Sequence, residues 1–124
     1  MRKVRVWDDA LNEMLYGRVE QFDDMLGFRF EKHLETENPI YMWETGLKDK
    51  NGKEIYEGDV IGRKSTITGE MYYYKVEWDA ETARFMAAGE TIHELVSSSL
   101  ERGNVWLGNI YEHPHLLKGD GCDA

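Results

Sequence analysis

The stretch TGLKDKNGKEIYEGDVI, residues 45–61, combines closely spaced turn residues with many charges and few apolar side chains. Its Asn51-Gly52 pair is a strong β-hairpin signal, because both central residues of a type I′ turn need positive φ. Gly58-Asp59 predicts a second reversal, in which the Asp59 side chain accepts hydrogen bonds from backbone amides at the foot of the next strand. The segment is therefore predicted to be a solvated, charged hairpin that connects two parts of a β-sheet protein.

The apolar residues of this stretch predict how the hairpin attaches to the rest of the protein. They are few and spaced along it: Leu47, Ile55, Val60 and Ile61. A strand, a charged hairpin and a Gly-Asp-Val entry into the next strand form a sequence that is typical of small SH3-like barrels. These four residues are expected to pin the hairpin onto such a barrel.

Short segments with period-two alternation predict further strands on both sides of this stretch. They cover residues 3–7, 14–22, 27–33, 40–43, 71–79, 83–87 and 104–111. The clearest alternation, in 71–79, predicts four side chains on one face: Tyr72, Tyr74, Val76 and Trp78. The fold class predicted is mainly β with one short helix, arranged as a small SH3-like barrel.

The helix is predicted near residues 92–102, where apolar residues recur at helical spacing. Thr91 and Glu94 fit a capping box, and Gly103 fits a left-handed stop. Pro114 suits the first position of a closing helical turn. Residues 1–118 are expected to form one domain, and residues 119–124 a flexible tail.

Composition narrows the protein class. The chain has 124 residues, 41% of them hydrophobic, which suits one globular domain. It contains neither an apolar run long enough to span a membrane nor a signal peptide, and its lone Cys122 has no partner for a disulfide. A cytoplasmic location is therefore expected. The net charge of −9, from 24 acidic and 15 basic residues, disfavours binding to nucleic-acid phosphates.

Four segments together resemble the YopX family of phage and prophage proteins. They are VRVWD near the N-terminus, the opening stretch at 45–61, VEWD at 76–79 and GNIYEHPHLL at the end. The resemblance covers residues 4–117 and implies a mostly β, SH3-like barrel encoded by a phage or prophage and present in the bacterial cytoplasm. The family has no established activity, so the resemblance implies no catalytic residues. Its usual ending is closer to GNIYENPELL, and here His113 and His115 replace two of those residues.

The residues themselves indicate neither an enzyme nor a metal protein. His113 and His115 are separated by Pro114, and the spacing shows no third or fourth ligand that would converge on a metal. The residues of the adjacent pair Asp8-Asp9 are expected to face opposite ways if they lie in a strand, and to be solvated if they lie in a loop. Cys122 has no basic neighbour to activate it. We therefore predict no catalytic residue, no metal and no cofactor.

Two binding hypotheses remain. The first is a module that binds a host or phage protein through its aromatic side chains, with homo-oligomerisation left open. The second is a small barrel that binds single-stranded nucleic acid, with aromatic rings beside five cations: Lys48, Lys50, Lys53, Arg63 and Lys64. The acidic charge of the chain ranks the protein partner first. Lys48, Lys50 and Lys53 form a candidate binding ribbon.

Overall fold

A computed structural model describes residues 3–22, 25–90 and 92–116 of the chain. Contacts divide the chain into two compact units, and the division falls between Glu44 and Thr45, inside a strand. The single domain expected over 1–118 stays a prediction, and the tail at 119–124 lies outside the described residues. None of the helices described has the length and apolar character needed to cross a membrane.

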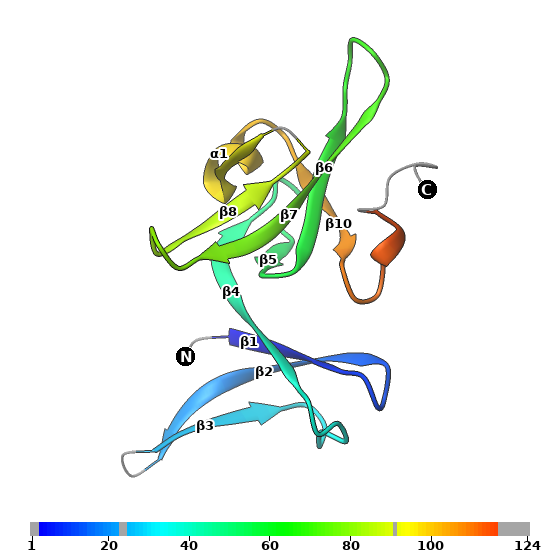
Figure 1. Ribbon diagram of the computed structural model, residues 1–124. Coiled ribbons are helices and arrows are strands. Elements are labelled where there is room, and N and C mark those ends of the chain that lie inside the picture. The colour runs from blue at the N-terminus through cyan, green and yellow to red at the C-terminus, as the bar shows by residue number, and fades with distance from the viewer. Residues whose placement is uncertain (1–2, 23–24, 91, 117–124) are drawn as a thin grey trace. The chain divides into compact units, whose positions relative to one another are not determined.

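The first unit is an antiparallel sheet with the strand order β3-β2-β1-β4 (Figure 1). Its strands are β1 (Lys3–Asp8), β2 (Glu13–Phe22), β3 (Met25–Phe30) and the first part of β4 (Ile40–Lys48). In the register, Val4 lies between Gly17 and Trp43, and Val6 lies between Leu15 and Tyr41. Opposed residues share a face, so one face of this unit carries the buried valines together with aromatic residues.

The second unit begins within β4, whose neighbour on that side is β5 (Glu54–Tyr56). A five-stranded antiparallel sheet follows, in the order β10-β6-β7-β8-β9. Its strands are β6 (Asp59–Lys64), β7 (Met71–Asp79), β8 (Arg84–Ala88), β9 (His93–Leu95) and β10 (Val105–Asn109). Helix α1 (Val96–Glu101) packs against β8 and β9, and the 3-10 turn η1 (Pro114–Leu116) follows β10 (Figure 1).

The core of the second unit is a cluster of buried side chains: Ile55, Ile61, Tyr74, Val76, Ala87 and Val96. Two of the four predicted pins, Ile55 and Ile61, belong to this cluster, and Leu47 packs against it. In β7 the face predicted from alternation is buried only in the middle, at Tyr74 and Val76. Tyr72 and Trp78 lie near the strand ends and are exposed.

The structure confirms a mainly β protein with one short helix, but the predicted barrel is wrong. Among the described residues, the strands form two five-stranded sheets in which the first and last strands are not bonded to each other. The spacing of short strands predicts how many strands exist. It does not predict which strands pair, and the pairing decides whether a sheet closes into a barrel.

The helix is shorter than predicted. Residues His93–Leu95 form β9, which pairs with β8, and α1 begins after Leu95 without a side-chain cap. The predicted cap residue Thr91 lies outside the described residues. Pairing with β8 satisfies the backbone hydrogen-bonding groups of residues 93–95. These residues therefore do not have to join the helix to satisfy them. The predicted stop is confirmed, since Gly103 has φ of 98°.

The hairpin at Asn51-Gly52 exists, but its turn is not type I′. Gly52 has φ of 84°, whereas the positive-φ residues other than glycine in the described chain are Asn12 and Ala83. The Gly52 N–H donates to the Asp49 carbonyl at 3.0 Å. A turn closed in this way and followed by a left-handed glycine matches a three-residue hairpin loop with a G1 bulge, which needs only one positive φ.

Candidate functional site

The candidate ribbon of Lys48, Lys50 and Lys53 is exposed, but the acid between them is not. Asp49 is 6% exposed, so the prediction that the charges of this hairpin are all solvated is wrong. Asp49 Oδ1 accepts the backbone N–H groups of Asn51 and Lys53, both at 2.9 Å. With the carboxylate turned inward, the hairpin presents its lysines to solvent.

The second oxygen of Asp49 joins the hairpin to the last strand of the sheet. Asp49 Oδ2 accepts the backbone N–H of Trp106, in β10, at 2.9 Å. Burial alone raises the pKa of the Asp49 carboxyl. The hydrogen bonds from three backbone N–H groups and the nearby Lys53 ammonium outweigh burial and hold this pKa below its usual range. Asp49 is therefore an ionised anchor for the hairpin.

Trp106 brings the lysine ribbon and the histidine pair together. The Lys53 ammonium lies 4.5 Å from the centre of the Trp106 ring, as a cation–π contact. The His113 ring meets the same indole edge-on, with centroids 6.2 Å apart. His115 is next to His113, at 6.4 Å. Sequence spacing gave no sign that these two groups share one tryptophan.

His113 already has a structural partner. Its Nδ1 accepts the backbone N–H of Asn109 at 3.1 Å, and its ring lies where a Cβ on Gly108 would have to go. In the part of the chain that the structure describes, no three His, Cys, Asp or Glu side chains gather as metal ligands. The absence of a metal stays a prediction, and Cys122 lies outside the described residues.

The second predicted turn, at Gly58-Asp59, has the expected chemistry. Gly58 has φ of 84°, and Asp59 Oδ2 accepts the Tyr56 N–H at 2.7 Å. The Gly58 N–H donates to the Val76 carbonyl at 2.8 Å, and the Gly58 carbonyl accepts the Ile110 N–H at 2.9 Å. This turn thus links the central stretch to both β7 and the C-terminal segment.

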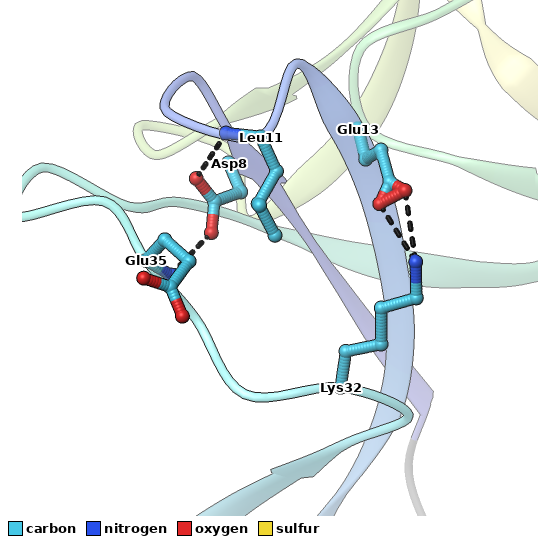
Figure 2. A network of polar contacts seen from close by, with 5 residues as sticks. All are labelled: Asp8, Leu11, Glu13, Lys32 and Glu35. Carbon is cyan, nitrogen blue, oxygen red and sulfur yellow. Dashed lines mark hydrogen bonds and ion pairs between the residues drawn. The ribbon is translucent and has the colours of Figure 1, made fainter.

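Asp8, the last residue of β1, performs the same task in the first unit, whereas its neighbour Asp9 is exposed. It is fully buried, and one oxygen accepts the N–H groups of Ala10 and Leu11. The other oxygen accepts the Glu35 N–H at 2.7 Å (Figure 2) and also the Thr36 N–H at 3.3 Å. Burial raises the pKa of the Asp8 carboxyl, but these four donors together lower it below its usual range.

Sequence reasoning did not predict that exposed aromatic residues of the first unit form one cluster. We call the four side chains Phe28, Phe30, Tyr41 and Trp43 the four-ring cluster. The Phe28 ring stacks on the Tyr41 ring with centroids 5.0 Å apart and lies 6.2 Å from the Trp43 ring. Phe28 remains 42% exposed and Tyr41 remains 43% exposed. The alternation in residues 27–33 places Phe28 and Phe30 on one face but does not indicate their contact with Tyr41 and Trp43.

The rings of the four-ring cluster come from strands that are not neighbours, and Gly17 lies between two of the strands concerned. Phe28 lies on β3 and Tyr41 on β4, three strand spacings apart, which is about 14 Å in a flat sheet. A Cβ at Gly17 would be 2.0 Å from the backbone oxygen of Arg29. Because Gly17 has no side chain, β3 can approach β2 closely there.

Of the remaining cations of the nucleic-acid hypothesis, Arg63 is paired across the sheet with the exposed Tyr72. Arg63 and Lys64 lie at the end of β6, opposite Tyr72 and Met71. The exposed Trp78 lies at the other end of β7, where it packs edge-on against Phe85 at 4.9 Å. Its neighbours in the chain, Glu77 and Asp79, are acidic.

Comparison with known proteins agrees with this architecture. The family model described as YopX protein matches residues 3–118. The crystal structure of protein EF1440 from Enterococcus faecalis is similar, with a TM-score of 0.63 and 25% sequence identity over 94% of this chain and 98% of that one. No curated protein matches the sequence. The family match spans nearly the whole chain, and the chain belongs to the YopX family.

Proposed function

We propose that this YopX-family protein is a non-catalytic binding module whose partner is another protein. The observation that carries the proposal is the four-ring cluster, in which Phe28 and Tyr41 stack on each other and still expose 42% and 43% of their surface. Stacked rings are rigid, so their burial against a partner costs little conformational entropy, and aromatic anchors dominate many protein interfaces.

The lack of a catalytic role is part of the proposal, and the buried acids support it. Asp8, Asp49 and Asp59 each direct a carboxylate oxygen at backbone N–H groups of a nearby turn. Backbone hydrogen bonds hold the pKa of Asp8 and Asp49 below its usual range, and none of the three carboxylates can leave its donors without a local opening of the fold. They therefore serve the fold rather than proton transfer.

A protein partner accounts for the surface better than a single-stranded nucleic acid does. Stacking of bases requires open aromatic faces beside cations. The ring beside the lysine ribbon, Trp106, has Lys53 over its face. The exposed ring Trp78 follows Glu77 and precedes Asp79. The net charge of −9 adds long-range repulsion.

The finer parts of the proposal come from the sequence. We place the gene in a phage or prophage and the protein in the bacterial cytoplasm, with a phage or host protein as its partner. An SH3-like arrangement of the second unit belongs to the same proposal. The support is the YopX-like motifs, together with a composition that fits a reducing compartment.

The test is capture of partners from a bacterial lysate with and without nuclease, followed by binding measurements with the purified partner. The double variant Phe28→Ser, Tyr41→Ser is expected to weaken binding about tenfold or more, the usual effect of losing an aromatic anchor. Tyr72→Ser, at a residue 40% exposed in the second unit, is the matched control and should bind like the parent. Melting temperatures verify that each variant is folded.

Two results would overturn the proposal. One is recovery of nucleic acid alone, with every captured protein lost after nuclease treatment. The other is a purified protein partner that binds the double variant as tightly as the parent, because the four-ring cluster would then have no part in recognition.

A further inference from the structure

The sequence contains one Asn-Gly pair, and the structure places it at the exposed end of the hairpin between β4 and β5. Asn51 and Gly52 are both exposed. We propose that Asn51 is a site of spontaneous deamidation, and that hydrogen bonds to Asp49 hold this site closed in the folded protein. The inference concerns chemistry within the chain and does not depend on the proposed protein partner.

The reaction needs only the chain and water. The backbone nitrogen of Gly52 loses its proton and attacks the side-chain carbonyl carbon Cγ of Asn51. A new N–C bond closes a five-membered succinimide, and the amide nitrogen leaves as ammonia. Water then opens the ring at either carbonyl, which yields aspartate or isoaspartate at position 51. Glycine favours the attack, because it has no side chain to hinder its own nitrogen.

The geometry of the turn opposes this attack. The nucleophile, the Gly52 nitrogen, has its N–H committed to the Asp49 carbonyl at 3.0 Å. The neighbouring N–H groups of Asn51 and Lys53 are both held by Asp49 Oδ1 at 2.9 Å. The Gly52 nitrogen must turn from the Asp49 carbonyl towards Asn51 Cγ to react. The hairpin must therefore open locally before the ring can close.

The product would keep the hairpin open. Isoaspartate inserts an extra methylene into the backbone between positions 51 and 52, which moves the Gly52 N–H away from the Asp49 carbonyl. Either product also adds a negative charge between Lys50 and Lys53, beside the Asp49 carboxylate. Like charges at this spacing repel each other. Deamidation is thus expected to loosen the hold of Asp49 on its backbone donors.

The test compares full-length protein at one mildly alkaline pH, folded in buffer and unfolded in denaturant, by peptide mapping with mass spectrometry. Opening requires the loss of two or three hydrogen bonds, so the folded protein should deamidate at Asn51 about tenfold to hundredfold more slowly. Amide hydrogen exchange at Gly52 measures the same opening. Its protection factor should agree with this slowing within about threefold. Asn51→Gln identifies the product peptide by its loss.

Variants separate the role of Asp49 from general loosening. Asp49→Asn should raise the deamidation rate of the folded chain towards the denatured rate. Asp79→Asn removes a carboxylate that caps the β7–β8 turn instead, and should leave the rate unchanged. Equal deamidation rates in the folded and the denatured parent would overturn the proposal that hydrogen bonds to Asp49 hold this site closed. So would a slowing much larger than the Gly52 protection factor, and so would the absence of product in denaturant. If Asp49→Asn does not fold, the comparison with Gly52 exchange in the parent decides.

Discussion

The carboxylate of Asp49 accepts the backbone N–H of Trp106 at 2.9 Å, between residues 57 positions apart in the sequence. The Lys53 side chain, from the same hairpin, covers the Trp106 ring. A connector that reads as a solvated loop is therefore fixed to β10 at two points, one of them through a buried charge. The stability of the second unit should depend on this charge more than on any of the exposed lysines.

Asp49→Ala should lower the free energy of unfolding by at least about 2 kcal/mol, because each buried N–H that loses its acceptor costs roughly 1–3 kcal/mol. Lys50→Ala, at the next position and exposed, should change it by no more than about 0.5 kcal/mol. Urea denaturation midpoints measure both variants. Equal midpoints for the two would show that the anchor contributes nothing.

Gly52→Val should lower the free energy of unfolding by about 1–3 kcal/mol, since a β-branched residue at φ of 84° is strained. No atom lies within 4 Å of a Cβ at this position, so the cost would arise from the backbone alone. Gly52→Asn is the control and should cost less, because asparagine tolerates left-handed φ. A valine variant as stable as the parent would contradict the turn geometry. Gly58→Val should behave like Gly52→Val, for the same reason.

Gly17→Ala should destabilise the protein by about 1–3 kcal/mol, the usual cost of overpacking. The added Cβ would meet the Arg29 backbone oxygen at 2.0 Å, and backbone cannot move aside as a flexible side chain can. Arg18→Ala, one position along β2 and exposed, is the matched control. Thermal unfolding of both variants measures the difference, and an unchanged melting temperature for Gly17→Ala would contradict the close approach of β3 to β2.

Stability should fall on acidification below about pH 4. The folded-state pKa values of Asp8 and Asp49 are lower than their ordinary value of 3.8. A carboxyl whose pKa is depressed on folding stabilises the protein at pH values above its unfolded-state pKa. That stabilisation is lost as the pH falls through the folded-state pKa. Asp49→Asn should therefore flatten the acid side of a stability–pH profile measured in urea. An equally steep profile in that variant would mean that the pKa of Asp49 is not depressed in the folded protein.

Stoichiometric zinc should leave the melting temperature unchanged within error, because a metal that bound the folded state would raise it. The His113 Nδ1 already accepts the Asn109 N–H, and Pro114 separates the two histidines. A rise that disappears in the double variant His113→Ala, His115→Ala would reveal a metal site at this turn.

The sequence by itself determined most of the local structure. Alternation of apolar and polar residues located the strands, with 71–79 matching β7, because the side-chain period of a strand is a property of the chain alone. Gly52, Gly58 and Gly103 were assigned positive φ for a similar local reason. The motifs also identified the YopX family.

Tertiary structure decided everything that depends on partners distant in sequence. Asp49 lies in a charged hairpin, which predicts solvation, and Asp8 is the polar last residue of β1. Only the fold aims backbone N–H groups at them from Glu35 and Trp106. Pairing of 93–95 with β8 shortened the helix, and open strand orders replaced the expected barrel. The four-ring cluster likewise joins Phe28 to Tyr41 across strands that are not neighbours, a contact that no local pattern encodes.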